Sequence, residues 1–181
     1  MTKANSDQLA YVGKKPGSRD SNAWYTPVRY VELVKEVLGE IDLDPFSSEY
    51  ANRAIRAKKI FTVSDSAFEN EWPSGNMFMN PPYGRGMIER AVEIFLHHAT
   101  YIGTVDDAIV LTNASTETKW FQALLKNSQA VCFTNHRINF YCEDGKETSG
   151  NTKEQAFFYF GDDRDIFTEV FSSIGTVLKV A

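Results

Sequence analysis

Cysteine and histidine are scarce in this chain of 181 residues, and long apolar runs are absent from it. The two cysteines, Cys132 and Cys142, have neither the spacing of metal ligands nor the number that a disulfide framework requires. Only three histidines are present, so we expect no metal site. No apolar run approaches the roughly 20 residues of a membrane-spanning helix. We therefore expect a cytoplasmic, metal-free protein that does not enter a membrane.

Acidic residues outnumber basic ones, and the resulting net charge of −5 disfavours a protein that coats nucleic acid. An enzyme that visits DNA needs only a local positive surface, and the run from Arg53 to Lys59 holds four basic residues and no acid. Such runs are also common on solvated surfaces, so both interpretations stay open here. Residues 1–21 are polar and lack the apolar core of a secretory signal. We expect a polar tail there and a single domain over residues 22–181.

The most unusual stretch of the chain is Met-Asn-Pro-Pro-Tyr-Gly, which begins at Met79. Pro81 and Pro82 cannot donate backbone hydrogen bonds, and each fixes φ at about −65°, so the neighbouring carbonyl groups are held in fixed directions. Asn80 adds a side-chain carbonyl and Tyr83 adds a flat ring. Two acceptors and a ring suit the binding of a planar amino group. A strand-ending turn would use the same residue types, because Asn and Pro are common turn formers.

Apolar periodicity predicts strands that alternate with helices. Thr26 is expected to cap a helix that has Pro27 at its first position and ends at Gly39. Asp162 is expected to cap the last helix. The other helices are expected within residues 50–59, 86–96, 116–126 and 163–174, the strands at 41–44, 60–63, 77–79, 108–111, 130–134, 155–160 and 176–180, and a hairpin around residues 143–145.

This order of elements predicts an α/β fold, with a doubly wound, mostly parallel sheet and an antiparallel edge pair formed by the late strands. In such sheets ligands bind at the carboxyl ends of the strands. Polar pairs follow apolar runs at four of these ends: Asp44-Pro45, Asp65-Ser66, Asn80-Pro81 and Thr112-Asn113. We therefore expect the four pairs to share one edge of the sheet and to form the ligand site.

Five short segments occur in an order that resembles the small phage-type DNA N-6-adenine methyltransferases, the Dam-like family. They are Trp24–Pro27, Leu43–Pro45, Asn80–Gly84, Thr118–Phe121 and Arg137–Phe140. The resemblance covers nearly everything from Trp24 onward. It implies a Rossmann-like fold that binds S-adenosyl-L-methionine and transfers its methyl group to the N6 amine of adenine. It also implies double-stranded DNA as the partner and a bacterial or phage-infected host cell.

The resemblance assigns a cofactor-binding role to residues from three segments. Asp44 is placed for the ammonium or the ribose of the cofactor, and Asp65 for its adenine amino group. Thr26 would line the pocket through its hydroxyl. The remaining cofactor-binding residues are expected to be Trp24, Tyr25, Pro27, Pro45, Phe46 and Phe68. The glycine-rich turn of many enzymes that use this cofactor is missing, since Asp44 is followed by Pro-Phe-Ser-Ser.

For catalysis, the resemblance points to the Asn80, Pro81, Pro82 and Tyr83 stretch. The side-chain oxygen of Asn80 and the backbone carbonyl of Pro81 would accept the two protons of the target amine, and Tyr83 would stack on a base swung out of the duplex. Lys119 and Arg137 are expected to contact DNA. By contrast, the helical spacing of Trp120 and Phe121 with Leu124 indicates core residues.

Two other functions fit the same residues. An amino-methyltransferase acting on cytosine N4 or on protein glutamine would use similar chemistry. Asn80 favours adenine or glutamine, because a leading serine is commoner for cytosine, and glutamine methylators of this type usually carry the glycine-rich loop that is missing here. A non-catalytic module that binds DNA or the cofactor would keep the fold, although the intact central motif argues against it.

Overall fold

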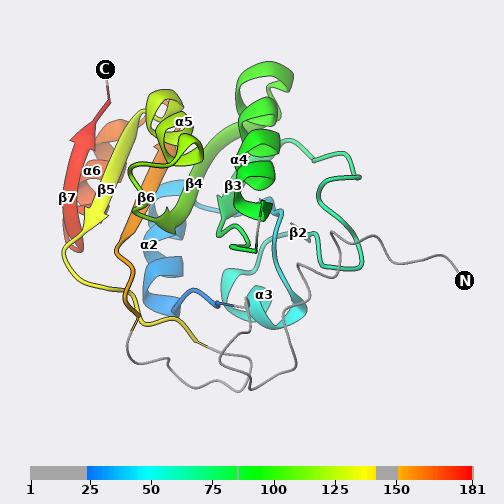
Figure 1. Cartoon of the computed structure of the whole chain (residues 1–181), viewed down its shortest axis with the longest axis horizontal. Helices are drawn as coiled ribbons and strands as arrows, with labels where there is room; N and C mark the ends of the chain where they lie inside the picture. Colours follow the sequence, from blue (N-terminus) through cyan, green and yellow to red (C-terminus); the bar gives the residue numbers. More distant parts are fainter. Residues whose placement is uncertain (1–23, 85, 142–150, 181) are drawn as a thin grey trace, which may run out of the picture.

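The computed structural model describes residues 24–84, 86–141 and 151–180, and within them the strands form one sheet in the order β2-β1-β3-β4-β6-β5-β7 (Figure 1). The strands are β1 Leu43–Asp44, β2 Lys59–Ile60, β3 Gly75–Met79, β4 Val105–Asn113, β5 Ala130–Thr134, β6 Gln155–Phe160 and β7 Gly175–Lys179. The helices are α2 Val28–Leu38, α3 Glu49–Ile55, α4 Met87–His97, α5 Lys119–Asn127 and α6 Arg164–Phe171, with a π-helical turn, η1 His98–Ile102, after α4.

Five of these seven strands in the described residues run in the same direction. The strands β2, β1, β3 and β4 pair in parallel, and β5 has their direction because it and β4 are both antiparallel to β6. The outermost strand, β7, is antiparallel to β5. The predicted doubly wound, mostly parallel sheet with antiparallel strands at one end is confirmed. The structure refines the order there, because the two reversed strands, β6 and β7, lie on either side of β5.

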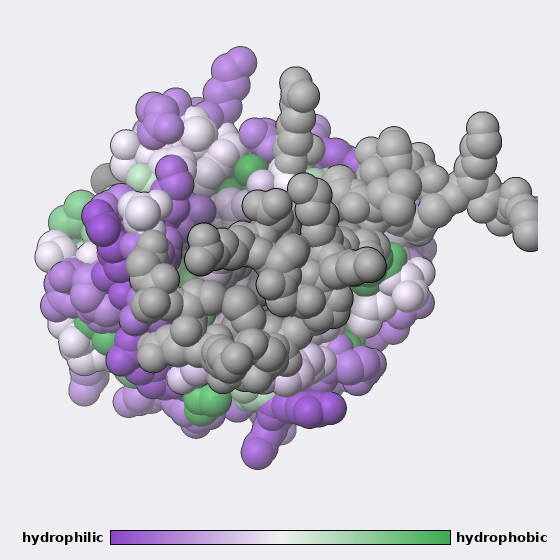
Figure 2. Space-filling model, turned by 60° about the horizontal axis from the view of Figure 1, so that its bottom comes forward, coloured by the Kyte–Doolittle hydropathy of each residue, from purple (hydrophilic) through white to green (hydrophobic). Residues whose placement is uncertain are grey.

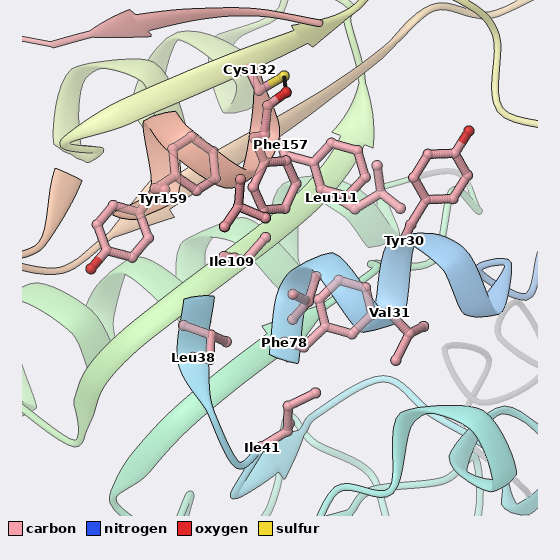
Figure 3. Close-up of a cluster of buried hydrophobic side chains, with 14 of the residues drawn as sticks. Tyr30, Val31, Leu38, Ile41, Phe78, Ile109, Leu111, Cys132, Phe157 and Tyr159 are labelled. Carbon is pink, nitrogen blue, oxygen red and sulfur yellow. Dashed lines mark hydrogen bonds between the residues drawn. The ribbon is translucent and has the colours of Figure 1, made fainter. Parts of the chain in front are cut away.

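Helices cover both faces of the sheet, which explains why its central strands read as continuous apolar runs. In β3, Phe78 points to the face covered by α2, α3 and α6, whereas Met77 and Met79 point to the face covered by α4 and α5. Figure 3 shows the first of these layers, where Tyr30 and Val31 of α2 pack over Phe78 and its neighbours on β4 and β6. The predicted core positions Trp120 and Phe121 are confirmed as buried residues of α5.

Two predicted helix caps are wrong. The first helix in the described part of the chain, α2, begins at Val28, and no side chain of that part caps it; the hydroxyl of Thr26 accepts instead from the distant Asn80. The last helix is capped by Asp163 rather than Asp162, because the Asp163 Oδ1 atom accepts from the Ile166 amide at 3.1 Å. In both cases the sequence identifies a residue type that can cap a helix, but it does not determine whether that side chain caps the helix in the folded protein.

The second strand is shorter than predicted. It ends at Ile60, and shortly afterwards the chain turns, where the Asp65 amide donates to the Thr62 carbonyl at 3.1 Å. The expected tail at residues 1–21, Cys142 and the hairpin around residues 143–145 lie outside the described residues.

Candidate active site

The candidate site lies along the edge of the sheet where the parallel strands end. In Figure 1 the arrowheads of β4 and β5 point to the lower edge of the view, whereas that of β7 points the other way. Asp44 is the last residue of β1, Asn80 directly follows β3, and Asn113 is the last residue of β4. The shared direction of these strands places all three residues at the same edge, as the sequence predicted for them.

Figure 2 brings this edge of the molecule forward. Around the atoms drawn in grey, the visible described surface is mostly hydrophilic, with small and separate hydrophobic areas.

Asn80 is held by the first described segment of the chain. Its Nδ2 atom donates to the backbone carbonyl of Trp24 at 3.0 Å and to the hydroxyl of Thr26 at 3.3 Å. A carbonyl oxygen only accepts hydrogen bonds, so the NH₂ side of the amide must face Trp24. The Oδ1 atom of the same amide therefore points away from the Trp24–Pro27 segment. The structure thus brings Trp24 and Thr26, two predicted cofactor-binding residues, onto the predicted catalytic asparagine.

The Trp24–Pro27 segment is fixed by contacts of its own. The backbone of Tyr25 pairs with that of Tyr141 through two hydrogen bonds of 3.0 Å each. The ring of Tyr25 packs on Tyr50 of α3, with centroids 4.8 Å apart, and the exposed Trp24 ring meets the edge of Phe140 at 6.3 Å. Sequence reasoning predicted the function of this segment but not this pairing, which joins residues more than a hundred positions apart.

Tyr83 connects the loop after β3 to the end of β4. Its hydroxyl accepts a hydrogen bond from the backbone amide of Asn113 at 2.7 Å, and its half-buried ring packs against the core layer under α4 and α5. Burial raises the pKa of the Tyr83 hydroxyl, so the group stays neutral at physiological pH. Pro81 and Pro82 are buried. The loop is therefore anchored on both sides of the prolines, by Asn80 and by Tyr83.

Asp44 is a buried carboxyl group at the end of β1, only 3% exposed. Burial raises its pKa to about 7, although the nearby Ser47 side chain and a hydrogen bond from the Phe46 amide act in the opposite direction. Within the described residues no lysine, arginine or histidine forms an ion pair with it. A buried carboxyl group without a cation is costly, and a positively charged ligand would compensate it. Asp44 thus fits a site for an ammonium group.

The other predicted cofactor-binding residues lie around this strand end. Phe46 and Phe68 are in contact, with ring centroids 5.3 Å apart, and the guanidinium of Arg90 lies 4.4 Å from the Phe68 centroid. They form an aromatic pair beside Pro45, which follows Asp44 directly. Asp65 differs, because its carboxylate is exposed and accepts from the Thr62 hydroxyl at 3.4 Å. Its position in a surface turn leaves it accessible to a ligand.

The two predicted DNA-contacting residues are both exposed. Lys119 is the first residue of α5, which follows the carboxyl end of β4. Arg137 follows β5 and forms an ion pair with Glu154 at 3.1 Å. An anionic ligand of Arg137 would have to compete with this acid.

The basic run from Arg53 to Lys59 does not form one uniform patch. Lys58 pairs with Glu40 at 2.7 Å and Asp42 at 2.9 Å, near the amino ends of β1 and β2. Arg53 lies over the ring of Tyr50. The structure therefore places Lys58 at the edge of the sheet opposite Asn80, in an acidic setting.

Sequence reasoning missed a buried glutamine beside the site. The Gln155 Oε1 atom accepts from the Ile138 amide at 2.8 Å, and its Nε2 atom donates to Asn113 Oδ1 at 3.4 Å and Lys153 O at 2.7 Å. It thus fixes the segment that follows Arg137 to the end of β4. The sequence held one signal for Gln155, which is its place as the one polar residue at the start of the apolar run Gln-Ala-Phe-Phe-Tyr-Phe.

Neither a metal site nor a membrane span is found in the part of the chain that the structure describes. No group of three or more histidine, cysteine, aspartate or glutamate side chains there is arranged to hold a metal ion. No helix in that part combines the length and the apolar character needed to cross a membrane.

The fold and the site define an α/β protein with a candidate ligand site at the carboxyl edge of a mixed sheet. The chain belongs to the DNA N-6-adenine-methyltransferase (Dam) family, which matches residues 14–178. This confirms the family that the sequence motifs resemble.

Comparison with curated proteins finds no match. Among solved structures, the chain is similar to a dimethyladenosine transferase from Plasmodium falciparum, with 8% sequence identity and a TM-score of 0.46. The similarity covers 80% of this chain and 64% of that one, so this chain spans less than two thirds of that protein.

Proposed function

We propose that this protein transfers a methyl group from S-adenosyl-L-methionine to the exocyclic N6 amine of adenine in double-stranded DNA, in the cytoplasm of a bacterial or phage-infected cell. The observation that carries the proposal is the fixed orientation of Asn80, whose Nδ2 atom is bound to Trp24 and Thr26. Its Oδ1 atom is consequently turned away from these two groups and is left to accept a proton from a ligand. Membership of the Dam family supports the same reaction.

The proposed cofactor site is built around Asp44. When bound, S-adenosyl-L-methionine supplies an electrophilic methyl group on a sulfonium. The Asp44 carboxylate binds the ammonium group of the cofactor, which compensates a buried negative charge that no cation of the described residues neutralises. Phe46 and Phe68 pack against the adenine, and Asp65 accepts from its amino group. The Trp24–Pro27 segment, including Tyr25, closes the pocket next to Asn80.

The proposed catalytic groups are two oxygens that bind the target amine. The amine of adenine is a poor nucleophile, because its lone pair is delocalised into the ring. Asn80 Oδ1 and the Pro81 carbonyl accept its two protons, which draws the nitrogen toward tetrahedral geometry and frees the lone pair. The same oxygens stabilise the positive charge that develops on the nitrogen. No strong base is needed, since the methylated ammonium readily loses a proton to water.

One experiment tests this function and separates it from its alternatives. The purified protein is incubated with methyl-labelled cofactor and unmethylated double-stranded DNA, and the digested nucleosides are analysed by mass spectrometry. The proposal predicts label in N6-methyladenine. Label in N4-methylcytosine, or in glutamine of added protein, would assign a different acceptor. Cofactor binding without any transfer would indicate a non-catalytic module.

Tyr83 provides a second prediction, because its ring and its hydroxyl have separate roles. We expect Tyr83→Phe to lower the free energy of unfolding by about 1 kcal/mol, since the Asn113 amide loses its acceptor, and to reduce turnover less than tenfold. Tyr83→Ala should reduce turnover about a hundredfold, because stacking on the base is lost. Denaturant unfolding and steady-state kinetics measure both effects. Equal losses in the two variants would contradict a stacking role.

Arg137 provides a third prediction, about DNA affinity. Arg137→Ala should weaken DNA binding and lower the slope of log K against log salt by about 1, as expected for one lost phosphate contact. Glu154→Gln should strengthen binding at low salt, because it releases the arginine from its ion pair. Lys58→Ala is the matched control, since Lys58 pairs with acids at the opposite edge. A change in slope for Lys58→Ala and none for Arg137→Ala would contradict the assignment.

A further inference from the structure

Within the proposed reaction, on which this inference rests, we propose that the Trp24 backbone carbonyl and the Thr26 hydroxyl are positioning groups for Asn80. They hold its side-chain amide in the one orientation that presents Oδ1 to the target amine. The site would therefore require an amide at position 80, and a carboxylate would not replace it.

The Asn80 Nδ2 atom donates two hydrogen bonds, to the Trp24 carbonyl and to the Thr26 hydroxyl. An asparagine amide has two nearly isosteric orientations, one of which presents Oδ1 and the other NH₂ to a given neighbour. Here the nearer neighbour, at 3.0 Å, is the Trp24 carbonyl oxygen, which has no proton to donate. The reversed orientation would place two acceptors against each other. The Thr26 hydroxyl, which is buried, supplies the second acceptor at 3.3 Å.

The positioning groups are themselves rigidly held. Tyr25, which lies between them, forms both backbone hydrogen bonds of its bridge with Tyr141. Immediately after Thr26, Pro27 is buried and its carbonyl accepts from the Tyr30 amide at 2.9 Å as α2 begins. Orientation of the amide therefore costs little at the moment of reaction, which is the condition for effective electrostatic stabilisation.

The chemical consequence concerns the choice between amide and carboxylate. Both side chains carry an oxygen that can accept a proton of the amine. Only the amide also carries the donor that the Trp24 carbonyl and the Thr26 hydroxyl require. An ionised carboxylate at this position would turn one oxygen toward the Trp24 oxygen and be repelled. A protonated carboxyl group would restore the pattern, because its O–H can donate to Trp24 while its carbonyl oxygen accepts from the amine.

The Asn80→Asp variant tests this inference through its pH dependence. Turnover is measured at saturating cofactor and DNA and divided by the wild-type value at each pH, which cancels the titration of Asp44 on β1 and of other groups that both proteins share. We expect this ratio to rise about tenfold per pH unit between about pH 8 and pH 6 as the introduced carboxyl group takes up a proton. A ratio that stays constant or falls over this range would overturn the inference.

The Thr26 variants give a second and independent test. Thr26→Val keeps the shape and removes the acceptor, so kcat should fall about tenfold at saturating cofactor, in addition to any weakening of cofactor binding. Thr26→Ser should restore kcat, because it keeps the hydroxyl. An unchanged kcat in Thr26→Val, or a loss confined to cofactor affinity, would overturn the inference and leave Thr26 with a cofactor-binding role alone.

A measurement without turnover separates this inference from the proposed function. In ¹⁵N-labelled protein, the side-chain NH₂ signals of Asn80, assigned by their loss in Asn80→Ala, should be protected from exchange in the wild type. They should exchange faster in Thr26→Val and not in Thr26→Ser. If the wild type transfers no methyl group to DNA, the proposed function fails while these signals still report the orientation. Unprotected signals in an active wild type would overturn the inference alone.

Discussion

The Asn80→Ala variant is expected to lose about a thousandfold in methyl transfer, the upper end of the loss seen when one preorganised polar contact to a transition state is removed. The substitution deletes one of the two oxygens that bind the amine. Cofactor binding should stay within about threefold of the wild-type value, because Asp44 and the aromatic pair of Phe46 and Phe68 are untouched. Single-turnover kinetics with labelled cofactor measure the first quantity, and calorimetry measures the second.

Asn127→Ala is the matched control for this variant. Asn127 is an exposed asparagine at the end of α5, away from the edge that carries Asn80, and its side chain donates only to the Ala123 carbonyl one turn earlier. Its replacement should leave both transfer and cofactor binding unchanged. Full transfer by Asn80→Ala would refute the catalytic role of Asn80, and a parallel loss of cofactor binding would assign it to the cofactor site instead.

The Asp44→Asn variant is expected to bind the cofactor at least about thirtyfold more weakly at pH 8, and also to unfold less easily. The two effects have one cause, the burial of an ionised carboxyl group that no cation among the described residues pairs with. The folded-state pKa of about 7 lies above the usual value, so the wild-type protein loses stability as pH rises from about 4 to 7. Removal of the charge should therefore raise the free energy of unfolding above pH 7, by at most about 4 kcal/mol, and much less near pH 4.

The same carboxyl group predicts how cofactor affinity depends on pH. An ammonium group binds the ionised form, so affinity for the wild type should be full above about pH 7 and should fall up to tenfold per unit below it. The affinity of Asp44→Asn should be flat over this range. Calorimetry at several pH values measures both.

Asp106→Asn serves as the control, since Asp106 is an exposed aspartate near the start of β4, at the opposite edge. Its replacement should change the free energy of unfolding by less than about 0.5 kcal/mol. An Asp44→Asn variant that is destabilised at pH 8, or one that binds the cofactor normally, would show that Asp44 has a structural role.

The fold was predictable because its determinants are local or periodic. Burial on one or two faces leaves a local pattern in the sequence. The patterns here are the apolar runs of β3, β4 and β6 and the amphipathic spacing in α2 and α5. The boundaries of the helices were less predictable where a side chain can form hydrogen bonds with more than one partner. Thr26 has the properties of an N-cap residue, but its hydroxyl meets Asn80, which lies 54 positions away in the sequence.

Within the candidate site, the predictable part consists of residues directly after strands. Asp44 and Asn80 are of this kind, because the end of a parallel strand fixes the edge at which they lie. The contacts that orient Asn80 join distant parts of the chain and leave no local pattern. The Trp24 carbonyl on Asn80 is a backbone group that could have belonged to any residue. Burial raises the pKa of Asp44, and the extent of that burial depends on the folded structure rather than on a local residue pattern.

The most direct test of the account is a structure of the protein bound to a non-reactive cofactor analogue and to DNA with an unpaired target adenine. We expect the adenine N6 atom to lie within about 3 Å of both Asn80 Oδ1 and the Pro81 carbonyl oxygen, with the ammonium group of the analogue on Asp44. An adenine held elsewhere, or an analogue bound at the opposite edge of the sheet, would contradict the account.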